Sequence, residues 1–213
     1  MKEREYMKKI ISAILAIILL VTFISCTNDT GTSSLIENTP YSYSQQYEAE
    51  KLTYCLIRSM DKTAFEENRA EFDHAKLLVV LSCVEDKDFR YVKMLPLNSN
   101  YEKEFSVPVC ESIIYDILGE ETDVHSLFAD RHYNEERDLY EFSTDFGLHG
   151  KYYGENFEFT GESGGLNCSV SFDLYEEKNI NGDPVYVNIG KYRFSYKLLT
   201  DKNCWQFAGF EKL

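Results

Sequence analysis

The sequence predicts an α+β fold, with helices in the first half of its globular part and an antiparallel sheet in the last third. After Ser44, apolar residues recur every three or four positions, which is the spacing of one helix face. After Leu139 they alternate with polar residues between glycine-rich turns, as in neighbouring antiparallel strands. The 16 tyrosines and 14 phenylalanines also favour sheet, because aromatic rings pack well on a pleated surface. Helices first and strands later is the order typical of α+β proteins.

The first 26 residues have the pattern of an export signal. Basic residues up to Lys9 precede an uncharged apolar run, 10–26, that ends in small residues and a cysteine. The segment Phe23-Ile24-Ser25-Cys26 resembles a bacterial lipobox. That resemblance implies a signal peptide over 1–25 and a diacylglyceryl group on the Cys26 thiol. Acyl chains on Cys26 would hold the chain on the outer face of the cytoplasmic membrane, in the cell envelope.

Two alternatives to the lipoprotein interpretation stay open. The run 10–26 is seventeen residues long, at the lower edge of what spans a bilayer, so it would also serve as an uncleaved signal anchor. An ordinary secretory signal is the other alternative.

Charge and composition restrict the partners of the remaining chain. Residues 26–43 are predicted to be the lipidated cysteine and a flexible tether, and 44–213 a single domain. Removing 1–25 takes away four basic and two acidic residues and changes the net charge from −14 to −16. Such acidity excludes nucleic acid and argues against anionic polymers as partners, because like charges repel. An unknown small molecule or an envelope protein remains as partner, beside the membrane itself.

The first part of the domain predicts two helices. From Ser44 to Met60 the apolar residues follow helical spacing, which indicates an amphipathic helix. Thr63 and Glu66 have the spacing of a capping box, which predicts a second, short helix through Phe72.

Two apolar runs, 77–84 and 89–95, follow on either side of Glu85-Asp86-Lys87-Asp88. We interpret them as a strand, a polar turn and a strand. A buried helix is the alternative for the first run, because periodicity alone does not separate the two.

The next helix is predicted over 108–118, where Pro108 is typical of a helix start and Gly119 of a helix end. A short helical turn is predicted around 124–128. Strands are predicted over 139–142, 152–160, 166–175, 185–199 and 204–210. Short turns between them indicate an antiparallel meander with one wet face.

The ending Tyr192-Arg193-Phe194-Ser195-Tyr196, followed by Trp205-Gln206-Phe207-Ala208-Gly209-Phe210, resembles the last two strands of the cystatin-like and nuclear-transport-factor-like superfamily. The resemblance implies N-terminal helices packed into a strongly curved sheet, or cone. It implies no single function, because the superfamily includes enzymes, ligand binders and interaction modules. Its catalytic members use an Asp–His or Asp–Asp pair inside the cone.

The domain offers weak candidates for that chemistry. The inward positions of the best strands are apolar, namely Cys168, Val170, Phe172 and Phe194, and Asp173 lies on the opposite register. His149 falls in a predicted turn and His74 at a helix end. We therefore predict no catalytic residue.

A divalent metal is the next candidate. His125, Asp130, His132 and Glu135 lie close together in sequence, but no HxH or HxxxH spacing places two imidazoles on one face. The segment is interpreted as a solvated loop, and no metal site is predicted. A glycine-rich phosphate loop is absent, so no cofactor is predicted.

Five cysteines follow Cys26, namely Cys55, Cys83, Cys110, Cys168 and Cys204. Their apolar neighbours predict buried free thiols, although the sequence leaves one or two disulfides open. Cys110 follows Pro108 at a helix start, where a thiolate would be stabilised. Core packing is the preferred interpretation there.

An aromatic and acidic cluster is the last candidate, formed by Tyr152, Tyr153, Phe157 and Phe159 with Glu155 and Glu158. Such a surface binds sugars or cationic peptides, but the same residues also fit the two faces of an ordinary strand. The sequence predicts a non-catalytic ligand- or partner-binding lipoprotein and does not identify its binding residues. An envelope enzyme and an accessory subunit of a membrane complex are the alternatives.

Overall fold

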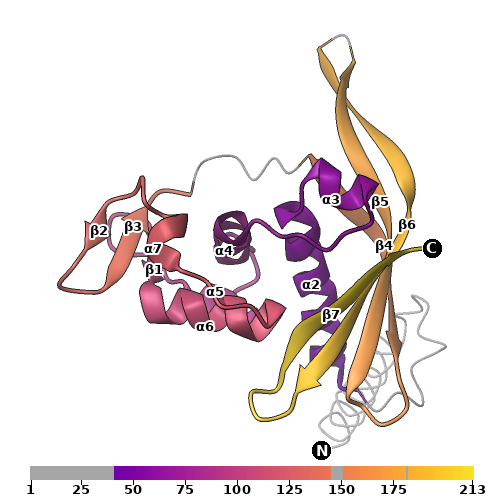
Figure 1. Cartoon of the computed structure of the whole chain (residues 1–213), viewed down its shortest axis with the longest axis horizontal. Helices are drawn as coiled ribbons and strands as arrows, with labels where there is room; N and C mark the ends of the chain where they lie inside the picture. The colour runs from indigo at the N-terminus through magenta and orange to yellow at the C-terminus, as the bar shows by residue number, and fades with distance from the viewer. Residues whose placement is uncertain (1–40, 145–150, 181) are drawn as a thin grey trace, which may run out of the picture. The chain divides into compact units, whose positions relative to one another are not determined.

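The structure is a computed structural model that describes residues 41–144, 151–180 and 182–213 of the chain (Figure 1). Helices and two antiparallel sheets make up these residues, which confirms the predicted α+β class. In chain order the elements are α2 (Tyr43–Ser59), α3 (Lys62–Glu66), α4 (His74–Ser82), α5 (Arg90–Met94), β1 (Lys103–Ser106), α6 (Val107–Leu118), α7 (Val124–Leu127), β2 (Tyr133–Asn134), β3 (Leu139–Phe142), β4 (Tyr152–Gly161), β5 (Asn167–Ile180), β6 (Asp183–Leu199) and β7 (Cys204–Lys212). Within these residues, no helix is both long and apolar enough to cross a membrane.

The larger sheet is an antiparallel meander of four of the five strands that the sequence places in one meander. The fifth, β3, pairs instead with β1 and β2 in a separate sheet, so that part of the prediction is wrong. The strands of the larger sheet follow chain order, β4-β5-β6-β7. The predicted strands are all present, and β5 and β6 run further toward their shared hairpin than predicted. Each of the three pairings contains a register shift, the first of them between Glu155 and Glu158. Such shifts bend strands and increase their twist, which Figure 1 shows in β5 and β6.

Helix α2 packs on one face of this sheet. Its residues Leu52 and Leu56 are fully buried in the same core as Phe172 and Phe194 of the sheet. A Cβ added at Gly154 would lie only 2.7 Å from Ile57 Cδ1, so a glycine is needed for the close approach of β4 and α2. The predicted inward positions on β5 and β6, including Cys168 and Val170, are all buried.

Two polar contacts fix how α2 sits on the sheet. The indole Nε1 of Trp205 donates to the Gln45 carbonyl at 2.8 Å. The Thr53 and Tyr196 hydroxyls are 2.5 Å apart, and both side chains are buried. At its start, α2 is capped by Ser42 and Gln45, which form a capping box.

The predicted capping box at Thr63 is wrong. Helix α3 begins at Lys62, and its cap is Asp61, whose Oδ1 accepts a hydrogen bond from the Ala64 amide at 2.8 Å. The helix ends at Glu66 instead of Phe72. Asp61 is as good a capping residue as Thr63 and comes first, so the helix starts there.

The two strands predicted over 77–84 and 89–95 are also wrong, because these runs form α4 and α5. Asp73 caps α4 by accepting from the Lys76 amide at 2.9 Å. Leu77, Leu78, Val80 and Leu81 are all buried, since α2, α5, α6 and α7 pack around α4. A helix covered on most sides has no polar face, so its sequence lacks the helical period.

Helix α6 agrees with its prediction, including Pro108 in the first turn and Gly119 after the end at a left-handed φ of 72°. Helix α7 lies where the short helical turn was predicted. A smaller antiparallel sheet, in the order β1-β3-β2, completes this part of the chain. The sequence predicted only β3, because the four residues of β1 and the two of β2 are too few for an alternating pattern.

Candidate functional site

A cleft of about 490 Å³ lies between α2, the end of α4 and β4. This volume falls within the usual range for small-molecule sites. Its lining comes from Tyr47, Glu50, Lys51, Tyr54, Arg58, Val80, Cys83, Val84, Glu85 and Phe157.

One face of α2 supplies an alternating row of rings and cations. Tyr47, Lys51, Tyr54 and Arg58 are spaced by four, three and four residues, which places them along a single helix face. Lys51 Nζ lies 5.3 Å from the centre of the Tyr47 ring, and Arg58 Cζ lies 5.2 Å from that of Tyr54. Each cation therefore rests against the ring that precedes it in the row.

Arg58 has no carboxylate partner among the described residues. Its Nη1 donates to the Tyr54 hydroxyl at 2.5 Å, while its Nε is buried and has no acceptor. No ion pair joins Arg58 to any acid in the part of the chain that the structure describes. Each of the other arginines in that part forms an ion pair, namely Arg69, Arg90, Arg131, Arg137 and Arg193.

The opposite wall of the cleft is mainly apolar. Val80 and Val84 come from the end of α4 and the loop behind it, and Phe157 comes from β4. Phe157 owes its direction to the register shift in β4. Asn156 there has a left-handed φ of 54°. Because β4 has one residue more than β5 at this shift, the Phe157 side chain lies on the inner face of the sheet, the same face as Gly154. The Asn156 amide donates to Asp173 on β5 at 2.7 Å, which supports this turn of the backbone.

Acidic groups occupy the other end of the cleft. Glu50 lies eight residues before Arg58 on α2, about 12 Å away along the helix axis. Burial raises the pKa of the Glu50 carboxyl, and the charge of Lys51 opposes this in part. The Tyr47 hydroxyl donates to Asp86, and this bond raises the pKa of Tyr47 to about 12. The same bond ties α2 to the loop after α4.

Cys83 is the one cysteine of the cleft. The five cysteines of the described part are all free, and four of them are buried as predicted, whereas Cys83 is half-buried. Its sulfur lies 3.1 Å from the Thr144 hydroxyl and 3.5 Å from that of Ser82. Cys110 is fully buried, and burial raises the pKa of its thiol to about 12. The start of α6 therefore does not yield a reactive thiolate, and core packing is its role.

The predicted histidine candidates lie away from the cleft. His74 begins α4, with its ring nitrogens 2.9 Å from Glu120 Oε2 and 3.2 Å from the Thr122 hydroxyl. His125 Nδ1 lies 3.0 Å from the Tyr140 hydroxyl, and its ring meets Tyr133 edge-on. His149 lies outside the described residues.

The segment of His125, Asp130, His132 and Glu135 does not form a metal site. Across the residues that the structure describes, no three His, Cys, Asp or Glu side chains come together in a way that could hold a metal ion.

The aromatic cluster predicted on β4 is divided between the two faces of the strand. Tyr152 is buried, whereas Tyr153 lies on the other face, stacked on Tyr175 with ring centres 5.2 Å apart. Phe159 meets Tyr41 edge-on in the core. The interpretation as an ordinary strand is confirmed, and Phe157 alone of these rings lines the cleft.

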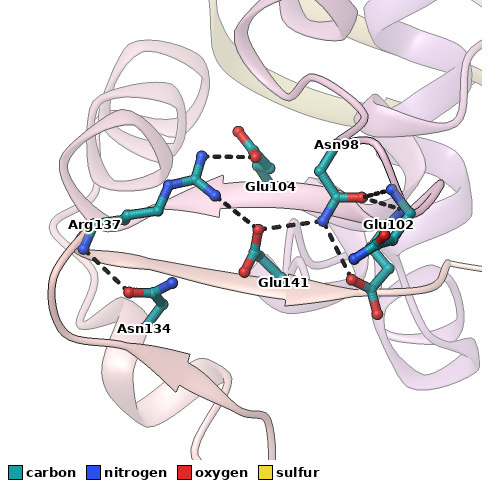
Figure 2. Close-up of polar contacts among 7 residues, drawn as sticks. Asn98, Glu102, Glu104, Asn134, Arg137 and Glu141 are labelled. Atoms are coloured by element: carbon teal, nitrogen blue, oxygen red, sulfur yellow. Dashed lines mark hydrogen bonds and ion pairs between the residues drawn. The ribbon is translucent and has the colours of Figure 1, made fainter.

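A second charged group lies on the smaller sheet (Figure 2). Arg137 donates to Glu104 at 2.7 Å and to Glu141 at 2.9 Å, and the Asn98 amide bridges Glu141 and Glu102. Arg137 is shared by two carboxylates, and Asn98 joins the third to this group, so these hydrogen bonds link β1 and β3.

A second hollow of about 340 Å³ lies beside α3. Glu176, its buried acid, is paired with Lys151 at 3.0 Å and Lys178 at 3.4 Å. Those bonds lower the pKa of Glu176, so its charge is already balanced. In the cleft, by contrast, the described residues give the Arg58 guanidinium no ion-pair partner.

The residues of α2 that line this cleft were not predicted from the sequence. The sequence does contain a pattern that indicates them, because their rings and cations recur at helical spacing and so form a second face of α2 beside the apolar one. Comparison of the chain with models of protein families, with curated proteins and with solved structures finds no match.

Proposed function

We propose that this chain is a cell-envelope lipoprotein, anchored through acyl chains on Cys26, whose globular part binds a ligand and catalyses nothing. The pattern of residues 1–26 supports the anchor. The cleft between α2, α4 and β4 supports the binding function, and one observation carries it. A cavity of ligand size has an aromatic and aliphatic wall, and its guanidinium, that of Arg58, has no carboxylate partner within residues 41–144, 151–180 and 182–213.

The side chains around the cleft favour binding over catalysis. Nucleophilic catalysis needs a base within hydrogen-bond reach of the nucleophile. The hydrogen-bond partners of the Cys83 sulfur in the described chain are two hydroxyls, those of Ser82 and Thr144, which are not bases. No described histidine lines the cleft, and two of them bond elsewhere, His74 to Glu120 and Thr122 and His125 to Tyr140.

We also propose that α2 and strands β4–β7 form a cone of the cystatin-like or nuclear-transport-factor-like kind. Its support is the packing of α2 on the bent face of β4–β7, with Gly154 allowing the close approach. The segment from α4 to β3 would then be an addition between the N-terminal helices and the sheet.

Filling the cleft tests the binding function. We expect Val84→Trp to abolish binding of small aromatic probes to the full chain in lipid nanodiscs, measured by ligand-observed NMR against empty nanodiscs. Val185→Trp is the matched control, because Val185 is 37% exposed on the β5–β6 hairpin and lines no part of the cleft. Circular dichroism would establish that both variants are folded. Probes that bind Val84→Trp as well as the unaltered chain would refute the proposal, and so would an unaltered chain that binds none.

A further inference from the structure

We propose that the ligand of this cleft is a small amphipathic carboxylate, whose anionic group pairs with Arg58 and whose apolar part lies against Phe157 and Val84. The inference rests on the proposed binding function of the cleft and names the chemical class of its ligand. Three features of the cleft carry it. They are the unmatched charge of Arg58, the edge of its guanidinium that has no acceptor, and the division of the cleft into two ends.

The first feature is the unmatched charge of Arg58. The chain has 36 acidic and 22 basic residues, so carboxylates are plentiful. Every other arginine in the described ranges has one as a partner, including the largely exposed Arg69. Arg58 is half-buried against Tyr54 and has none. A partly buried guanidinium without a counter-charge is unfavourable, and a ligand carboxylate would supply that charge.

The second feature is the edge of the guanidinium that remains for a ligand. Nη1 is committed to the Tyr54 hydroxyl, whereas Nε has no acceptor. Nε and Nη2 together form the edge that binds a carboxylate through two parallel hydrogen bonds. Nε is buried and has no acceptor among the described residues. The guanidinium therefore has to turn toward the cleft as the carboxylate binds, and the long arginine side chain permits this.

The third feature is the division of the cleft into a basic and an acidic end. Arg58 lies at one end of the row on α2, and Glu50 and Glu85 line the cleft with Lys51 at the other. Val84 and Phe157 supply apolar surface. A carboxylate is attracted to Arg58 and repelled by the acids, so the ligand has one favoured orientation. Its apolar part then extends from Arg58 over the ring of Phe157.

Three probes with the same apolar part test the charge of the ligand. They are 4-phenylbutyrate, 4-phenylbutyramide and 4-phenylbutylamine, each titrated by NMR against the full chain in lipid nanodiscs. We expect the carboxylate to bind about tenfold more tightly than the amide, as a charge-assisted hydrogen bond provides, and the amine to bind most weakly.

Arg58→Gln should remove this preference, so that the carboxylate and the amide bind equally. Arg69→Gln is the matched control, because it removes the same charge from an exposed residue outside the cleft. It should leave the preference intact.

The outcomes separate this inference from the function on which it rests. If none of the probes binds, or if Val84→Trp leaves their binding unchanged, the binding function of the cleft is refuted together with its ligand class. If all three bind in the cleft with equal affinity, the binding function stands and the carboxylate inference is refuted. A preference that persists in a folded Arg58→Gln chain, or that is lost equally in Arg69→Gln, would also overturn the assignment to Arg58. Arg58→Lys keeps the charge but loses the two-donor edge, so it should keep only part of the preference.

Discussion

Replacing Thr53 by valine should destabilise the fold more than replacing its partner, Tyr196, by phenylalanine. The two hydroxyls lie 2.5 Å apart between α2 and β6, and both side chains are at most 1% exposed. Thr53 has a single hydroxyl hydrogen, and it donates that hydrogen to the Ala49 carbonyl at 2.8 Å. The Tyr196 hydroxyl must therefore be the donor in the contact with Thr53.

The unequal effect follows from what each change leaves behind. Tyr196→Phe removes the donor, but Thr53 keeps its bond to Ala49, so the expected loss is about 0.5–1.5 kcal/mol for one hydrogen bond. Thr53→Val removes the acceptor and leaves a buried tyrosine hydroxyl without a partner, which costs about 1–3 kcal/mol. The double variant has no orphaned group, so it should be more stable than Thr53→Val alone.

Urea unfolding followed by tryptophan fluorescence would measure these differences. Trp205 is the only tryptophan of the chain and is fully buried at the contact of β7 with α2, so its emission reports on this core. A loss of 1 kcal/mol corresponds to about 2–4 °C in the melting temperature of a domain of this size. The reasoning is refuted if Tyr196→Phe is the more damaging single change, or if the effects of the two changes simply add.

Two further predictions concern the anchor and the packing of β4. Cys26→Ala should abolish acylation and release the protein from the membrane, and acyl labelling that persists in this variant would contradict the lipoprotein proposal. Gly161→Ala should destabilise the fold by about 1–3 kcal/mol, because the added Cβ would lie 2.0 Å from Tyr41 Cε2 in the core. Its control is Gly209→Ala, where the nearest side-chain atom is 3.8 Å away and a much smaller change is expected in the same unfolding assay.

The sequence correctly predicted those elements that bury only one face, because burial of one face produces a regular pattern of apolar residues. Helix α2 and strands β5 and β6 each bury one face, so their sequences show the helical or alternating period. Helix α4 is surrounded by four other helices, and the loss of its polar face made it resemble a buried strand. The pairing of β1 with β3 depends on contacts more than thirty residues apart, which no local pattern records.

The cleft was harder to predict than the fold, because its defining properties arise between elements. The lack of a partner for Arg58 is a fact about where every acid of the described chain lies, and it cannot be read from the residues beside Arg58. The row of rings and cations on α2 was visible in the sequence. Whether this row can bind a ligand depends on the side chains on the opposite side of the cleft.

The opposite wall of the cleft depends on irregularities in β4. Regular alternation after Tyr152 and Gly154 would place Asn156 toward α2 and send Phe157 to the outer face. The left-handed backbone at Asn156 and the shift before Glu158 reverse this and bring the Phe157 ring into the cleft. Gly154 meanwhile lets α2 lie close to the strand. An aromatic wall opposite Arg58 is thus produced by one bulge and one glycine, so changes at Asn156 or Gly154 should affect ligand binding although neither residue lines the cleft.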